Sequence, residues 1–167
     1  MNDTIKHIAL FIVLLLAQII VLNNINFMGF INPMLYILFI IVYPFKKDRS
    51  AILLLCFFLG LLIDFSLNSG GTNAAATLFI AYVRLPLLKS LMRKTDIDFQ
   101  LFNIDRLPFL KLLSFIAVLT FTHHLIVFAL EYFKLSDFGM ILSRTILTGI
   151  FTIILIIFSL LLMNKGK

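Results

Sequence analysis

The residues of this chain that could do chemistry are few, and each lies within a long run of apolar side chains. They are a glutamine, a cysteine, an aspartate and a histidine pair: Gln18, Cys56, Asp64, His123 and His124. A polar group among apolar neighbours costs free energy unless it is hydrogen-bonded, so each of these positions needs a partner. Such residues serve catalysis, ligand binding or helix packing, and their spacing helps to separate these uses.

Asp64 belongs to a series that repeats at helical spacing. Four residues spaced by four share one face of a helix: Cys56, Gly60, Asp64 and Asn68. The small residues of that face let a neighbouring helix approach closely. We expect Asp64 to be a structural carboxylate that accepts hydrogen bonds from the loop amides at Ser69 to Thr72. An ion or partner site is the alternative, but no second acidic residue stands at ligand spacing.

A glycine-containing turn follows Asp64 and leads into a helix that starts with small residues. Gly70 and Gly71 permit a positive φ and a close backbone approach. Gly71 and Ala75 form a small-xxx-small pair, which predicts tight helix packing. The turn is no phosphate-binding loop, because the Lys-Ser/Thr ending of that motif is missing.

The two histidines predict helix packing rather than metal binding. Adjacent residues point about 100° apart on a helix, so the pair cannot chelate one metal in the usual i, i+4 manner. His124 shares a face with Thr120 and Ala117, which favours a hydrogen bond between helices. We expect the same of Gln18. A further stripe of polar residues suited to helix packing consists of Thr145, Thr148, Thr152 and Ser159.

The sequence supports neither an enzyme nor a cofactor-binding or metal-binding protein. It contains no nucleophile-elbow serine, no HExxH motif and no aspartates paired at motif spacing. A nucleic-acid partner is also excluded. The formal charge of +6 is split among short connections instead of being gathered on one solvated face.

Composition makes lipid the solvent of this chain. Apolar residues make up 62% and charged residues only 13%, against about half and a quarter in a soluble domain. We predict one integral-membrane helical domain over residues 1–167, an all-α bundle with six transmembrane helices. The predicted spans are about Ile5 to Leu22, Met34 to Tyr43, Ala51 to Leu67, Thr72 to Leu91, Leu110 to Tyr132 and Phe138 to Met163.

The second predicted span is short for a full crossing because Pro33 and Pro44 bracket it. It recruits the preceding Phe27 to Ile31, thins the bilayer locally, or is shielded by neighbouring helices. Tyr36, beside its start, is one of the four tyrosines expected at the membrane interface.

Charges predict that both termini are cytoplasmic. Twelve basic residues, Arg84 and Lys89 among them, border one side of the six spans, and only Lys134 and Arg144 border the other. Three segments then face outward: Asn23–Pro33, Ser66–Gly71 and Tyr132–Asp137. The longest connection, Arg93 to Pro108, mixes apolar and charged residues and is expected to lie on the cytoplasmic membrane surface.

The segment from Gly60 to Arg84 resembles the MreD family of bacterial rod-shape-determining membrane proteins. The likeness lies in the Gly60-Leu-Leu-Ile-Asp64 helix end, the turn with Gly70 and Gly71, and the apolar helix that follows. Gln18 in the first span, Asn32-Pro33 before the second and the basic cytoplasmic connections also fit. Outside that segment the resemblance is one of length and architecture.

The resemblance implies a non-enzymatic scaffold of the complex that builds lateral peptidoglycan, in the bacterial inner membrane. The implied partners are a bitopic MreC-like protein, an actin-like filament, a SEDS glycosyltransferase and a penicillin-binding transpeptidase. The fold implied is similar to that of the S-components of energy-coupling-factor transporters. A substrate-capture subunit for a vitamin or other small molecule is therefore the alternative function. Such a subunit needs a concave pocket with convergent polar groups, whereas we expect the polar residues here to be scattered along packing stripes.

Overall fold

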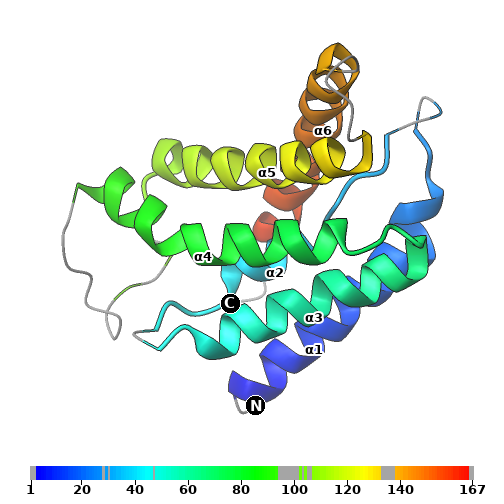
Figure 1. The fold of residues 1–167 in the computed structure, drawn as a ribbon. Coiled ribbons are helices and arrows are strands. Elements are labelled where there is room, and N and C mark those ends of the chain that lie inside the picture. The colour runs from blue at the N-terminus through cyan, green and yellow to red at the C-terminus, as the bar shows by residue number, and fades with distance from the viewer. Residues whose placement is uncertain are drawn as a thin grey trace.

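The fold follows from a computed structural model that describes residues 3–27, 29, 31–46, 48–93, 102, 104, 107–132 and 138–165. It is an all-α bundle, which confirms the predicted fold class (Figure 1). Its helices are α1 (Asp3–Leu16), α2 (Ile37–Val42), α3 (Ser50–Leu67), α4 (Thr72–Met92), α5 (Phe109–Tyr132) and α6 (Phe138–Lys165). A π-helical turn (Ala17–Val21) and a 3₁₀ turn (Leu22–Asn24) continue α1.

Five helices in the described part of the chain are long and apolar enough to cross a membrane. They are α1 with its continuation, α3, α4, α5 and α6. The second predicted span is instead represented by α2, which has only six residues. The chain nevertheless runs from one end of the bundle to the other between Asn24 and Phe45, because an extended stretch precedes α2 (Figure 1).

Neighbouring helices shield the short helix α2. Residues 36–41 are at most 2% exposed. Of the three ways in which the short span was expected to fit the membrane, the described residues therefore show shielding by neighbouring helices. The helix ends where the sequence requires, since Tyr43 precedes Pro44 and takes an extended ψ of 137°. Tyr36, expected at the membrane interface, is fully buried. The expected interfacial position was wrong, because the Tyr36 hydroxyl finds a buried hydrogen-bond partner in Asn73 and the whole side chain can therefore be buried.

The predicted small-residue seam joins α3 to α4 at Gly60. A Cβ built on Gly60 would lie 2.6 Å from the Cα of Ala74, so this predicted close contact is confirmed. Asn68, assigned to the same face, is exposed because it ends α3 in the left-handed conformation with φ 54°. The turn that follows needs its glycines for backbone conformation, with φ of 67° at Gly70 and 93° at Gly71.

The prediction that Gly71 and Ala75 together pack tightly against a neighbouring helix was wrong. Nothing lies within 4 Å of a Cβ built on Gly71, and Ala75 is exposed. The residues of α4 that face α3 are offset from that pair: Ala74 and Thr77 face Gly60. The stripe on α6 is buried as expected at Thr145, Thr148 and Thr152, and half-buried at Ser159.

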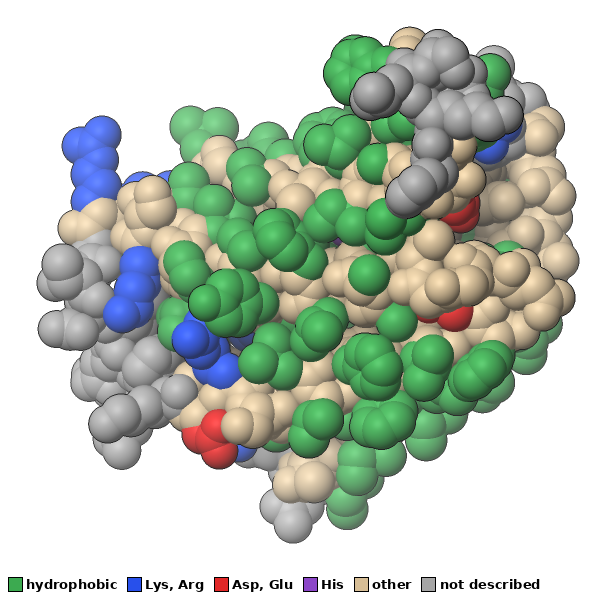
Figure 2. Space-filling model, viewed as in Figure 1, with side chains coloured by type: hydrophobic (Ala, Val, Ile, Leu, Met, Phe, Trp, Pro, Cys, Tyr) green, Lys and Arg blue, Asp and Glu red, His purple; other side chains and the backbone are tan. Residues whose placement is uncertain are grey.

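Arg84 is not the loop charge that the charge pattern assumed. It lies within α4 and is 2% exposed. Its Nη2 donates to the carbonyl oxygen of Tyr43, and its guanidinium lies 3.9 Å from the ring centroid of Phe45. Figure 2 still shows Lys and Arg side chains gathered toward the end where α3 begins and α4 ends, with apolar side chains over the middle. The predicted orientation of the termini stays a prediction.

The predicted surface element from Arg93 to Pro108 lies mostly outside the described residues. Of its apolar side chains, Phe102, Ile104 and Leu107 are partly buried against the main core.

Replacement of Gly60 tests the α3–α4 seam. Gly60→Ala adds a Cβ that collides with helix backbone, and overpacking of this kind costs about 1–3 kcal/mol. We expect a melting temperature several degrees below that of the parent protein, measured by circular dichroism in detergent. Gly139→Ala is the matched control because nothing lies within 4 Å of its added Cβ, and it should not lower the melting temperature. Equal melting temperatures for the two variants would contradict the seam.

Candidate functional site

The carboxylate of Asp64, near the end of α3, is hydrogen-bonded to the first turn of α4, and these contacts form the junction between the two helices. Its Oδ1 accepts hydrogen bonds from the Asn73 backbone N–H at 3.0 Å, the Asn73 Nδ2 at 2.9 Å and the Ser69 hydroxyl. Its Oδ2 accepts the Ala74 N–H at 2.8 Å. A carboxylate is favoured here because the first turn of α4 offers N–H groups without intrahelical partners. The predicted structural role therefore fits the geometry.

The donors to Asp64 differ from those expected. Within the predicted range 69–72, Ser69 is the described residue that contributes a hydrogen bond to the carboxylate, through its side chain. The backbone donors are Asn73 and Ala74, in the first turn of α4. The prediction missed them because the turn at Gly70 and Gly71 folds back and places the start of α4, not the loop, over Asp64.

Asn73 extends the junction toward the centre of the bundle. The hydroxyl of Tyr36 donates to Asn73 Oδ1 at 2.7 Å and lies 3.2 Å from His123 Nε2. All three side chains are at most 1% exposed. The hydrogen-bonded series Asp64–Asn73–Tyr36–His123 thus joins α3, α4, the start of α2 and α5. Neither Asn73 nor Tyr36 was predicted as part of a site, although Asn73 lies at a recognisable helix start and Tyr36 at the start of the proline-bracketed span.

Gln18 supports the irregular chain before α2. It lies in the π-helical turn after α1 and is 1% exposed. Its Nε2 donates to the Pro33 carbonyl oxygen at 3.0 Å and to Asn23 Oδ1 at 2.9 Å, and its Oε1 accepts the Leu35 N–H at 2.9 Å. The predicted buried hydrogen bonding is confirmed, but the partner is a non-helical segment instead of a helix.

His124 makes the interhelical hydrogen bond that its face predicted. Its Nε2 lies 3.2 Å from Thr152 Oγ1 on α6, and its Nδ1 lies 2.8 Å from the Thr120 carbonyl oxygen. The same Thr152 hydroxyl accepts the Met34 N–H at 3.1 Å. Gln18 and the His124–Thr152 pair thus reach the segment before α2 from different sides.

The polar side chains converge instead of being scattered along packing stripes, so that expectation was wrong. A cavity of about 220 Å³ opens beside the network, where the start of α4 meets the end of α5. Its polar lining includes Gln18, Asn73, Glu131 and Arg144. Linear spacing shows which residues share a face of one helix. It does not show how the faces of different helices turn toward each other.

The arrangement offers hydrogen bonding and little reactive chemistry. Asp64 already accepts four hydrogen bonds, and Cys56 is a buried free thiol in the core. No group of three His, Cys, Asp or Glu side chains within the described ranges could hold a metal ion.

Comparison with known proteins gives no match: no family model, no curated protein and no solved structure matches this chain.

Removal of the Asp64 carboxylate tests the junction. Asp64→Ala leaves the Asn73 and Ala74 N–H groups without their acceptor, which costs about 1–3 kcal/mol. For a chain of this size that corresponds to roughly 2–4 °C per kcal/mol in melting temperature. Asp64→Asn keeps one acceptor oxygen and should lose less.

Ser143→Ala is the control, because Ser143 is exposed and its hydroxyl donates only to Gly139 of its own helix. Melting temperatures should follow the order Ser143→Ala, Asp64→Asn, Asp64→Ala, from highest to lowest. An Asp64→Ala protein as stable as the control would show that the junction is dispensable.

Proposed function

We propose that this protein is a non-enzymatic membrane scaffold of the bacterial cell-elongation complex, the role that its resemblance to MreD implies. One observation carries the proposal. The MreD-like segment around Gly60, Asp64 and Asn73 is engaged in packing α3 against α4, and its carboxylate is saturated by hydrogen bonds. A motif used in this way supports a role that depends on the shape and stability of the bundle.

The outer surface offers material for contacts within the membrane. α6 exposes a long apolar face that includes Ile146, Ile150, Ile154 and Phe158, each at least 43% exposed. α1 and the π-helical turn that continues it expose a second apolar face that includes Ile12, Val13 and Ile20. Such faces suit lipid and the transmembrane helices of partners. The proposed partners are an MreC-like bitopic protein and, through it, an actin-like filament, a SEDS glycosyltransferase and a penicillin-binding transpeptidase, all at the inner membrane.

A substrate-capture subunit is the second candidate, and the polar cavity beside Asn73 favours it. Its volume of about 220 Å³ is nevertheless below the roughly 300–1,000 Å³ typical of small-molecule sites. Its wall also includes Tyr36 and Asn73, which are hydrogen-bonded to each other. The cavity suits an ion or a very small polar ligand better than a vitamin, so we rank the scaffold first.

Depletion and copurification separate the two functions. Depletion of a scaffold should make elongated cells round up, and tagged protein should retain cell-wall elongation proteins after detergent extraction. The Gly139→Ala variant should retain the cell-wall elongation proteins as well as the parent protein does. The Gly60→Ala variant shows which of these proteins are lost when the bundle is destabilised. Normal rod shape after depletion, together with an ATPase module in the purified complex and a defect in vitamin accumulation, would refute the scaffold and support capture.

A further inference from the structure

A second and larger cavity lies away from the polar network, between α1, α2 and α3. Its volume is about 470 Å³, within the roughly 300–1,000 Å³ typical of ligand sites. α1 lines it with Thr4, His7, Ile8 and Phe11, and Ile8 is 55% exposed. The cavity therefore opens on the lipid-facing surface of the bundle.

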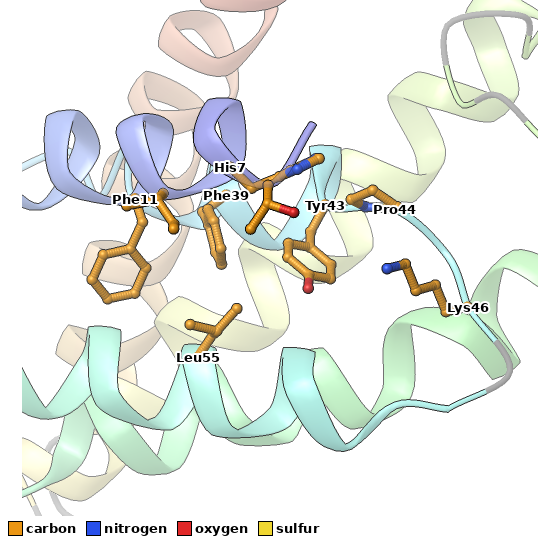
Figure 3. A pocket seen from close by; sticks show the side chains of 9 residues that line it. His7, Phe11, Phe39, Tyr43, Pro44, Lys46 and Leu55 are labelled. Atoms are coloured by element: carbon orange, nitrogen blue, oxygen red, sulfur yellow. The ribbon is translucent and has the colours of Figure 1, made fainter. Parts of the chain in front are cut away.

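The lining of this cavity is divided by polarity. Phe11, Phe39 and Leu55 form an apolar part, and His7, Tyr43 and Lys46 stand toward the other end (Figure 3). The side chain of Lys46 extends from the α2–α3 connection with its ammonium turned toward the cavity (Figure 3). Neither Asp nor Glu occurs among the nine described residues that line it.

Further positive charge stands behind the same connection. Lys46 also borders a smaller hollow lined by Arg49 and Arg84. The acidic residue of that hollow, Asp48, already accepts the Ser50 N–H at 2.9 Å, and this hydrogen bond lowers the pKa of its carboxyl group. Among the described residues that line the two hollows, Lys46, Arg49 and Arg84 are basic and Asp48 is acidic, at the end predicted to face the cytoplasm.

We propose that this cavity binds one anionic phospholipid. An acyl chain lies against Phe11, Phe39 and Leu55, and the headgroup phosphate faces Lys46 and His7. Basic pockets between transmembrane helices on the cytoplasmic side have the chemistry that retains anionic headgroups. This inference does not depend on the proposed scaffold function.

The shape of the lining favours an acyl chain over a partner helix. Helices that pack closely in membranes meet through small residues that let their backbones approach. Here two phenylalanines and a leucine form the apolar wall. A flexible chain can follow such an uneven surface, whereas a rigid helix would be held away from it.

The test uses the absence of tryptophan from this chain. Ile8→Trp places a single fluorescent reporter on the wall of the cavity, and Phe158→Trp places one on the exposed face of α6 as a control. Each protein is reconstituted in nanodiscs of phosphatidylcholine and phosphatidylglycerol. In one sample the phosphatidylcholine is brominated and in the other the phosphatidylglycerol, so that the brominated lipid quenches the tryptophan fluorescence. At position 8, we expect brominated phosphatidylglycerol to be enriched about fivefold over its bulk fraction, and at position 158 not at all.

Two lysine variants identify the headgroup site. Lys46→Gln in the Ile8→Trp background should abolish the enrichment. Lys111→Gln should leave it intact, since Lys111 is exposed at the start of α5 and lies outside the cavity lining. Equal quenching by the two lipids at position 8, or a preference that survives Lys46→Gln, would overturn the proposal.

Discussion

The backbone before α2 must satisfy its polar groups inside an apolar bundle, and the rest of the structure depends on that constraint. An unpaired N–H or C=O group in such surroundings costs several kcal/mol, on the order of an unmade hydrogen bond. Residues 33–36 are not helical, and the first N–H groups of any helix lack intrahelical partners. Side chains of other elements provide the hydrogen-bond partners. Gln18 donates to the Pro33 carbonyl oxygen and accepts the Leu35 N–H, and Thr152 accepts the Met34 N–H.

Polar residues that are far apart in the sequence contribute to the same hydrogen-bonded network around the segment before α2. Tyr36 begins α2, and its hydroxyl connects it to Asn73, which in turn binds Asp64. His124 holds the Thr152 hydroxyl that meets Met34. Intramembrane polar groups are costly and are usually retained for function. Here Gln18, Tyr36 and Thr152 make hydrogen bonds between separate elements, while the cavity beside Asn73 and the one beside Lys46 keep polar groups accessible.

Sequence patterns predicted the parts of the fold that depend on one helix at a time. The five long spans follow from apolar length, and the close approach at Gly60 follows from the absence of a side chain. The interhelical hydrogen bond of His124 was predicted because a polar side chain within an apolar span needs a partner, and Thr152 of α6 provides it. A structural role for Asp64 was expected because a turn with N–H groups follows it, but the backbone donors are Asn73 and Ala74 of α4.

The remaining features depend on how helices are rotated against each other, which spacing alone does not determine. Ala75 was expected at a contact, but the turn at Gly71 rotates α4 so that Ala74 and Thr77 face α3. Arg84 was counted with the charges that surround a cytoplasmic connection, although it lies within the predicted span from Thr72 to Leu91. The carbonyl oxygen of Tyr43 and the ring of Phe45 accommodate it within α4. The polar cavity escaped prediction because its walls come from five separate stretches of the chain.

Hydrogen–deuterium exchange across residues 33–42 reports whether side chains of other elements hold the backbone before α2. Thr152→Val removes the hydroxyl that accepts the Met34 N–H. Thr148→Val is the matched control, because Thr148 is equally buried on the same helix and its hydroxyl has no hydrogen-bond partner among the described residues. We predict faster amide exchange in residues 33–42 for Thr152→Val, and exchange like that of the parent protein for Thr148→Val. Unchanged protection of this segment in Thr152→Val, or equal loss in both variants, would contradict it.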